Sequence, residues 1–293
     1  MFTDEIQVAY TTKFVHPSNM LPTRNDLVKF NADLGSYPDG MPFIKQDAVR
    51  DLHKADLTVV IRQKSLESFV TGLFMVDALR ERGNFVRKLV LPFIPAARQD
   101  RINPEGDYLF TLKSVAKMIN DRNFDEVVVL DPHSTVATAL IDRVRVFPIA
   151  DMLHKFWVGY DAVIAPDKGA VGRAQEAADA LNIINGTNMP VIHADKTRDV
   201  ATGKLTGFDV SVEAGKHYLV FDDICDGGGT FIGLGDKIVQ QGASAGLFVT
   251  HGVFSKGTGV LSNIYGAITT TDSTLFDKHD VRVIPVVERM IIS

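Results

Sequence analysis

Cysteine pairs, long apolar runs and an excess of positive charge are all missing from this sequence of 293 residues. Its one cysteine, Cys225, allows neither an internal disulfide nor a thiolate-rich metal site, which favours a reducing compartment. No apolar run approaches the roughly 18 residues that a membrane helix needs. A net charge of −5 provides no overall field for nucleic acid. We therefore expect a cytoplasmic, globular protein with neither a membrane nor a nucleic acid as a partner.

Apolar residues are plentiful and follow alternating strand and helix patterns. They make up 45% of the chain, enough for one large or two medium cores. From about residue 55 onward, short β-branched runs alternate with helical spacings, which predicts parallel sheets covered on both faces. The predicted strands are residues 55–61, 88–94, 126–130, 161–165, 190–193, 217–221, 245–250 and 281–287, and the predicted helices are residues 65–82, 109–122, 169–181 and 230–241.

The alternation divides near residues 147–153, with an α/β pattern on either side. We expect an α/β fold of two domains, residues 1–148 and 149–293. Polar clusters follow four of the predicted strands, at residues 98–101, 131–133, 166–168 and 222–230. Because ligands of open parallel sheets gather at the carboxyl ends of the strands, these clusters predict a binding site.

The most specific pattern is VFDDICDGGGT, residues 220–230. Its three glycines allow backbone N–H groups to approach a phosphate, and the helix that follows has an N-terminus that favours anions. The two adjacent carboxylates are acceptors suited to paired hydroxyls. Together they predict a sugar-phosphate site, for which a solvated glycine-rich turn is the alternative. The residues assigned to this site are Asp222, Asp223, Asp226, Gly227, Gly228, Gly229 and Thr230.

Six motifs in this chain resemble those of the ribose-phosphate pyrophosphokinase family. VFDDICDGGGT resembles the phosphoribosyl-pyrophosphate motif that this family shares with phosphoribosyltransferases. The others are LPFIPAARQDR, VVVLDPHS, VIAPDKGAVGRA, ADKTRD and VTHGVFS, which follow the family's order. The resemblance runs from about residue 37 to residue 271 and therefore covers most of the chain.

This resemblance implies two phosphoribosyltransferase-type domains, with ATP loops in the first and the ribose 5-phosphate loop in the second. It implies that the β,γ-diphosphoryl group of ATP moves to the anomeric hydroxyl of ribose 5-phosphate, giving phosphoribosyl pyrophosphate and AMP. Such a transfer depends mainly on positioning and on neutralisation of charge. The family also implies a homodimer or a larger homo-oligomer.

The resemblance also implies roles for individual residues. Catalysis is assigned to Lys196 and Arg198, and Mg²⁺ is the expected cofactor, with His133 and Asp167 as its ligands. From chemistry alone, His133 is a structural strand-end histidine, since magnesium prefers oxygen donors. The residues assigned to ATP are Tyr37, Asp39, Arg98, Gln99, Arg101 and His133.

One departure concerns adenine binding. The family's Phe-x-Asp-Gly-Glu loop corresponds here to YPDGM, residues 37–41, so Met41 replaces the glutamate. Tyr37 is expected to stack on adenine and Asp39 to accept from its amine, with weaker discrimination against GTP than the glutamate would give. The alternative is a simple Pro-Asp-Gly turn. Residues 201–209 also differ from the usual family sequence, so the loop that covers the site is expected to close differently.

Two other functions remain as alternatives at this stage. A non-catalytic regulatory relative would use the same fold to bind partners, but retention of His133, Lys196 and Arg198 counts against it. A phosphoribosyltransferase would consume phosphoribosyl pyrophosphate, but the cations at residues 98–101 and the loop at residues 37–41 count against that.

Overall fold

The computed structural model describes residues 6–12, 26–31, 34–39, 41–44, 55–62, 65–102, 109–154, 156, 159–198, 205–275 and 280–293. The chain divides into two compact units. Unit 1 comprises Met1–Val146 and Val287–Ser293, and unit 2 comprises Phe147–Val286. The sequence placed all of residues 149–293 in one domain, whereas the structure groups the end of the chain with unit 1.

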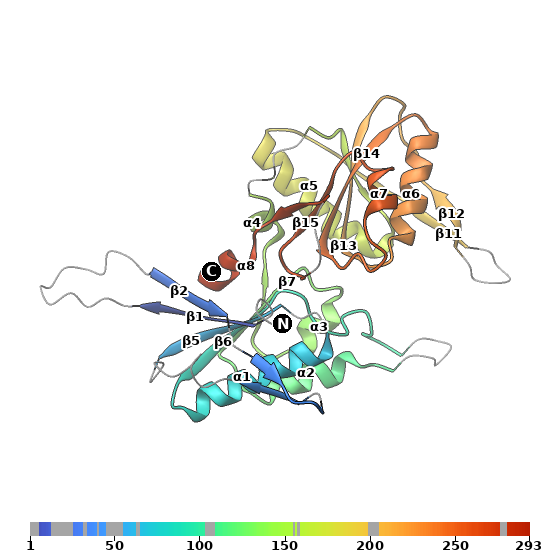
Figure 1. Cartoon of the computed structure of the whole chain (residues 1–293). Helices are drawn as coiled ribbons and strands as arrows, with labels where there is room; N and C mark the ends of the chain where they lie inside the picture. The colour runs from blue at the N-terminus through green and yellow to red at the C-terminus, as the bar shows by residue number, and fades with distance from the viewer. Residues whose placement is uncertain are drawn as a thin grey trace, which may run out of the picture. The chain divides into compact units, whose positions relative to one another are not determined.

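Unit 1 is built on a six-stranded sheet in the order β2-β1-β5-β6-β7-β8 (Figure 1). These strands are β1 (Ile6–Thr12), β2 (Asp26–Asn31), β5 (Asp56–Ile61), β6 (Phe85–Leu91), β7 (Glu126–Leu130) and β8 (Val144–Phe147). The strands β5, β6 and β7 run parallel, while β1 is antiparallel to both β2 and β5. The antiparallel strands lie before residue 55, where the sequence predicted no element.

Helices cover this sheet: α1 (Leu66–Glu81), α2 (Leu112–Asn120), α3 (Thr135–Leu140) and α8 (Val287–Ile292). A reciprocal cap starts α1, because the Ser65 hydroxyl accepts from the Ser68 N–H and the Ser68 hydroxyl accepts from the Ser65 N–H. The turn after α1 contains Gly83 at φ 82°, as expected for a helix stop. Phe69 and Leu73 are fully buried in the core of this unit. Figure 1 shows α1 and α2 on one side of the sheet and α8 on the other.

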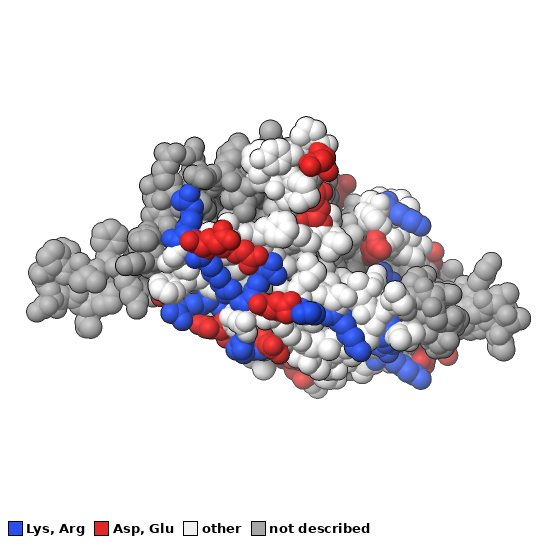
Figure 2. Space-filling model, turned by 90° about the horizontal axis from the view of Figure 1, so that it is seen from below, with Lys and Arg blue, Asp and Glu red and all other residues white. Residues whose placement is uncertain are grey.

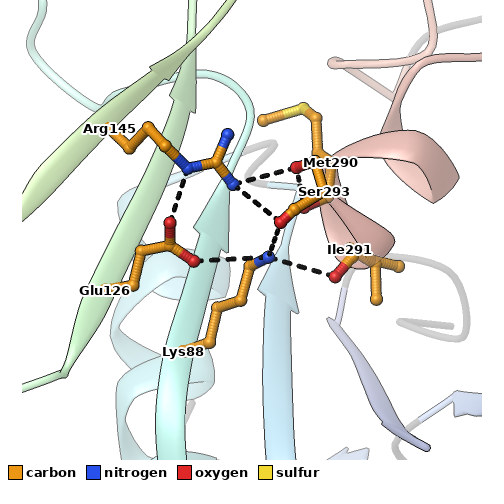
Figure 3. A network of polar contacts seen from close by, with 6 residues as sticks. All are labelled: Lys88, Glu126, Arg145, Met290, Ile291 and Ser293. Carbon is orange, nitrogen blue, oxygen red and sulfur yellow. Dashed lines mark hydrogen bonds and ion pairs between the residues drawn. The ribbon is translucent and has the colours of Figure 1, made fainter.

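A polar network explains why the chain's last residues belong to unit 1 (Figure 3). The Lys88 ammonium donates to the carbonyl oxygens of Ile291 and Ser293 at 3.1 and 3.4 Å. Arg145 donates to the Ser293 carbonyl and hydroxyl oxygens at 3.2 and 2.9 Å. Glu126 pairs with both cations. Cations from β6 and β8 thus satisfy carbonyl groups that the last turn of α8 leaves without helical donors.

Unit 2 contains a second six-stranded sheet, in the order β10-β9-β13-β14-β15-β16, and its pairings are all parallel. These strands are β9 (Ala162–Ala165), β10 (Val191–His193), β13 (His217–Cys225), β14 (Ser244–Gly252), β15 (Ile268–Thr271) and β16 (Arg282–Ile284). The strands β11 (Asp195–Arg198) and β12 (Leu205–Asp209) form a separate antiparallel pair. The helical elements are α4 (Ile149–Leu153), η2 (Lys168–Ala170), α5 (Val171–Asn185), α6 (Gly229–Gln240) and α7 (Gly259–Ser262).

Figure 1 shows α5 and α6 on opposite sides of the sheet of unit 2. The α/β fold with mainly parallel sheets flanked by helices is therefore confirmed. Several predicted bounds were wrong by a few residues, and the one that concerns the site is the end of β13, which continues to Cys225 instead of ending at Phe221. Asp222 pairs with Val249 of β14 and Ile224 with His251, so the adjacent carboxylates lie within the strand. The apolar pattern stops at Phe221, but the ladder continues because β14 runs alongside until Gly252.

Two surface features bear on partners. Among the described residues, no helix combines the length and the apolar character needed to cross a membrane. On the face drawn in Figure 2, lysine and arginine side chains lie beside aspartate and glutamate side chains. This mixing agrees with the near balance of 31 basic and 36 acidic residues in the chain.

Candidate functional site

The loop after β6 presents two of its polar residues to solvent. The Gln99 N–H donates to the Ala96 carbonyl at 2.8 Å, and the Gln99 carbonyl accepts from the Leu112 N–H at 3.2 Å. Ala96 has φ 55°, a left-handed conformation that turns the chain sharply here. Arg98 and Gln99 are both exposed. The loop is therefore braced by its backbone, while the side chains predicted to contact ATP face outward.

A bidentate ion pair fixes the next two residues. Arg101 donates to both carboxylate oxygens of Asp100 at 2.7 and 2.9 Å. Asp100 is 3% exposed, whereas the Arg101 side chain is 71% exposed. The hydrogen bond from Arg101 lowers the pKa of Asp100 from 3.8 to about 2; burial opposes this, while the Ser134 hydroxyl and His133 act in the same direction. Asp100 is therefore ionised near neutral pH and orients Arg101.

His133 lies at the end of the neighbouring strand β7. Asp131 precedes it with φ 36°, so the chain turns sharply as it leaves the sheet. His133 is half-buried. Because β6 and β7 are adjacent and parallel, their ends meet at one edge, which is why His133 influences Asp100. Unit 1 thus brings His133 close to the loop of residues 98–101.

The predicted adenine loop connects β3 (Leu34–Ser36) to β4 (Pro42–Ile44) in a hairpin. The Asp39 carboxylate accepts from the Met41 N–H at 3.1 Å, and the Tyr37 N–H donates to the Met41 carbonyl at 2.9 Å. The Tyr37 ring packs against Phe43 with centroids 4.9 Å apart. Tyr37 and Met41 are 58% and 53% exposed, so this turn has an aromatic surface open to solvent.

The carboxylates of β13 form a buried ion cluster with Arg173 of α5. One guanidinium nitrogen of Arg173 lies 2.9 Å from Asp223 and 3.6 Å from Asp222, and the three side chains are 7 to 15% exposed. Each carboxylate also accepts a backbone N–H, from Asp223 and Ile224 respectively. Two acids therefore share one cation in this cluster.

The excess of negative charge changes the protonation of the cluster. Burial raises the pKa of Asp222 well above its ordinary value, the charge of Asp223 raises it further, and Arg173 opposes both effects. Asp223 makes the closer contact with Arg173. Asp222 therefore holds a proton more readily than an exposed aspartate does, and the oxygens of the two carboxyl groups suit sugar hydroxyls.

The glycine loop follows directly and leads into α6. Gly228 has φ +76°, a conformation that residues with side chains rarely adopt, and Gly229 is the first residue of α6. A Cβ added to Gly229 would meet no atom within 4 Å. The first N–H groups of α6 have no partner within the helix, so this open space suits an anion. Asp226 is exposed beside it.

Cys225, which precedes the loop, has an unreactive thiol. It is buried, and burial raises the pKa of its thiol to about 12, with the charge of Asp226 as the next contribution. The thiol is therefore protonated near neutral pH, which makes it a poor nucleophile.

The predicted magnesium ligands belong to different units. Asp167 caps η2, since its carboxylate accepts from the N–H groups of Gly169 and Ala170 at 2.9 and 3.2 Å. Within the described ranges, no group of three or more His, Cys, Asp or Glu side chains is placed to hold a metal. Magnesium is often held by one or two carboxylates together with substrate phosphates and water, and Asp167 fits that kind of site.

The predicted catalytic residues Lys196 and Arg198 lie on β11, which pairs with β12. The register shifts between Thr197 and Arg198, so the regular alternation of faces is interrupted there. Their side chains lie outside the described part of the chain.

Sequence reasoning missed Arg173, although the motif VIAPDKGAVGRA contains it. Arg173 lies in the first turn of the helix that follows β9, and β9 pairs with β13. An arginine at the start of a helix after a strand could have suggested a site residue. Its contact with β13 could not be predicted, because that requires knowledge of the strand order. The residues assigned to the sugar-phosphate site, which run from Asp222 to Thr230, lie together as expected for a single stretch of chain.

Comparisons with known proteins identify a matching domain profile and similar pyrophosphokinases. A family profile described as "Phosphoribosyl transferase domain" matches residues 148–281. The ribose-phosphate pyrophosphokinase of Pyrococcus furiosus is 32% identical over 237 residues, which cover 78% of this chain and 80% of that protein. The ribose-phosphate pyrophosphokinase of Rhizobium meliloti is 31% identical over 227 residues, 72% of this chain and 71% of that protein.

A solved structure shares the fold. The phosphoribosylpyrophosphate synthetase from Mycobacterium smegmatis matches with a TM-score of 0.72 at 22% identity, covering 88% of this chain and 87% of that one. The match confirms the fold, and the family profile confirms a phosphoribosyltransferase-type domain within unit 2.

Proposed function

Because the chain belongs to the ribose-phosphate pyrophosphokinase family, we propose that it transfers the β,γ-diphosphoryl group of ATP to the anomeric hydroxyl of ribose 5-phosphate. The products are phosphoribosyl pyrophosphate and AMP. The similarity to pyrophosphokinases covers 237 residues, well beyond the domain at residues 148–281. This extent favours the pyrophosphokinase over a phosphoribosyltransferase, and the relatives' shared name favours an enzyme over a regulatory protein.

The observation that carries the proposal is the arrangement at the end of β13. Asp222 and Asp223, held by Arg173, offer acceptors for the ribose hydroxyls. The loop Asp226–Thr230 and the N-terminus of α6 bind the 5-phosphate through backbone N–H groups. A sugar that carries both a diol and a phosphate matches both halves of this arrangement.

ATP binds to the residues of unit 1. The exposed guanidinium groups of Arg98 and Arg101 suit the triphosphate, because a planar fork makes paired hydrogen bonds to phosphate oxygens. Gln99 contributes its amide, and His133 lies at the same edge of the sheet. Tyr37 stacks on the adenine ring, and Asp39 accepts from the exocyclic amine.

Lys196 and Arg198 of β11 stabilise the charge that develops on the diphosphoryl group as it moves. The chain's contribution to this transfer is positioning, since the acids of β13 hold the sugar while the cations of unit 1 hold ATP. Asp167 and His133 would hold magnesium, which supplies positive charge to the phosphate oxygens when bound. We also propose that the enzyme acts as a homodimer or larger assembly in the cytoplasm; light scattering of the purified chain tests its assembly.

The test of the reaction is incubation with ribose 5-phosphate, ATP and Mg²⁺, followed by quantification of AMP and phosphoribosyl pyrophosphate. The two products are expected to form in equal amounts. Formation of ADP would indicate ordinary γ-phosphoryl transfer, and lack of turnover with varied metals and donors would favour the regulatory relative. Lys196→Ala and Arg198→Ala are expected to lower kcat by about 10²-fold or more, as loss of a positioned charge stabiliser does.

A further inference from the structure

The turn that follows β14 is anchored beside the glycine loop. The Cys225 carbonyl accepts from the N–H groups of Val253 and Phe254 at 2.9 and 3.0 Å. The turn closes on itself, because the Gly257 N–H donates to the Phe254 carbonyl at 2.8 Å. Cys225 directly precedes the glycine loop, so these bonds hold the turn against the start of that loop.

Packing of Phe254 fixes the same turn from within. Its side chain is 6% exposed, and its backbone has φ 46°. A Cβ added to Gly252 would lie 2.2 Å from the Phe254 ring, so the ring occupies the space that the missing side chain leaves. The backbone that carries the next residues therefore has a defined position.

This turn places Lys256 over the glycine loop. A Cβ added to Gly227 would lie 3.5 Å from Cε and 3.9 Å from Nζ of Lys256, so the end of the lysine crosses directly above that glycine. Lys256 is exposed. Within the part of the chain that the structure describes, Lys256 makes no ion pair or hydrogen bond. Its ammonium is thus available to an anion in the loop.

The charges around the loop explain why an anion would need this lysine. Residues 222–230 contain three carboxylates and no lysine or arginine. Arg173 contacts Asp222 and Asp223 and therefore offsets their charge. A phosphate dianion in the loop consequently faces an excess of negative charge, which backbone N–H groups reduce only in part. A lysine ammonium supplies the missing point charge.

We propose that Lys256 binds the phosphate of ribose 5-phosphate against the glycine loop and thereby selects phosphorylated over unphosphorylated ribose. This inference rests on the proposed function of the loop and adds a specificity-determining residue to it. Lys256 contacts the 5-phosphate, whereas the diphosphoryl group is transferred to the anomeric hydroxyl of the sugar. Its loss should therefore raise KM for ribose 5-phosphate and leave kcat close to that of the wild type.

The test compares Lys256→Ala with the wild type by calorimetric titration of the full chain. The affinity for ribose 5-phosphate is expected to fall by roughly 10- to 100-fold, as for loss of a charged hydrogen bond, and its dependence on salt should weaken. The affinity for inorganic phosphate should fall in parallel, while that for ATP should stay within twofold. Lys256→Arg should retain most of the binding, because it keeps the charge.

Lys237→Ala is the matched control, since this lysine lies in the last turn of α6, away from its N-terminus. It should leave all three affinities unchanged. Ribose 5-phosphate affinity within twofold of the wild type in Lys256→Ala would overturn the proposal, and so would an equal loss for ATP. If the wild type binds ribose 5-phosphate but forms no phosphoribosyl pyrophosphate, the proposed reaction is wrong, and the role of Lys256 is still decided by the titrations.

Discussion

The cluster that follows β6 in unit 1 and the cluster at the end of β13 in unit 2 both combine arginine with aspartate, in opposite proportions. In unit 1, Arg98 and Arg101 accompany a single carboxylate, Asp100, and both arginines are exposed. In unit 2, two buried carboxylates share the buried Arg173. The first cluster therefore has more cations than acids and exposes its cations, whereas the second has more acids than cations and buries all three groups.

This difference matches the two substrates. Exposed guanidinium groups can meet a triphosphate while remaining hydrated, so their binding requires little desolvation. Buried carboxylates can select hydroxyls, because hydroxyls donate hydrogen bonds without bringing another negative charge. The same two residue types at the ends of parallel strands thus serve opposite kinds of ligand, depending on their ratio and burial.

The largest expected difference between the clusters is in stability. Arg173→Gln leaves two buried acids without their cation and should lower the free energy of unfolding by about 3–5 kcal/mol. Arg101→Gln removes an exposed partner and should cost about 1 kcal/mol or less. Denaturant titration measures both. Adding Asp222→Asn to Arg173→Gln should recover part of the loss. Equal losses in the two single variants would contradict the difference in burial between Arg173 and Arg101.

A steric probe should separate the substrates. Gly229→Ala adds a methyl group that meets no protein atom within 4 Å, so the fold should be retained. The methyl group would occupy space where the phosphate approaches, and the affinity for ribose 5-phosphate should fall at least about tenfold, with ATP little changed. Gly259→Ala is the control, because it also starts a helix and its Cβ also meets nothing. Unchanged titrations with ribose 5-phosphate would place the phosphate elsewhere.

The two clusters should respond to pH in opposite directions. The pKa of Asp100 is lowered to about 2, so its contribution to stability is present above its ordinary pKa of 3.8 and is lost as the pH falls toward 2. The pKa of Asp222 is raised, so the fold favours its protonated form and loses stability as the pH rises above the ordinary value.

Asn variants measured between pH 3 and pH 8 test this contrast. Asp100→Asn should be less stable than the wild type at pH 7, by about 1 kcal/mol because the partner Arg101 is solvated, and the difference should shrink in acid. Asp222→Asn should be more stable than the wild type at pH 8, with a difference that also shrinks in acid. If both substitutions changed the free energy of unfolding in the same direction, the opposite charge balances of the two clusters would be contradicted.

The smallest expected effect is on base selection. One oxygen of the Asp39 carboxylate accepts from the Met41 N–H, which leaves the other oxygen for a single hydrogen bond from adenine. Asp39→Ala should lower the ATP-over-GTP ratio of kcat/KM by about tenfold or less, equivalent to one modest hydrogen bond. Asp39→Asn, which keeps an acceptor oxygen for the turn, is the control. An unchanged ratio in Asp39→Ala would make the hairpin loop a simple turn.

The strand order of unit 2 shows which parts of the site the sequence could predict. The acids and glycines at residues 222–230 are consecutive, so a local motif was enough to identify them. The contact of Arg173 with Asp223 joins residues 50 positions apart, and it exists because β9 pairs with β13. Local periodicity contains no information about such a pairing, and this is why the arginine was missed.

Long-range contacts also explain the errors in the predicted fold. The apolar pattern stops at Phe221, so the sequence predicted that β13 ends there. In the structure, pairing with β14 extends the strand through polar residues that are not typical of a strand. The return of Val287–Ser293 to unit 1 depends on Lys88 and Arg145, which are far away in the sequence. Helix α1, with a local cap and a glycine stop, was predicted within one residue of its observed bounds.

The most direct test of opposite charge balances is calorimetric titration of both substrates into two variants. Asp223→Asn should weaken ribose 5-phosphate at least about tenfold and change ATP by less than twofold, because it replaces an acceptor oxygen of unit 2 with a donor. Arg98→Ala should do the reverse, because it removes a phosphate contact from unit 1. A crossed pattern of losses is the predicted result. Parallel losses of both substrates in both variants, or losses exchanged between them, would contradict the account.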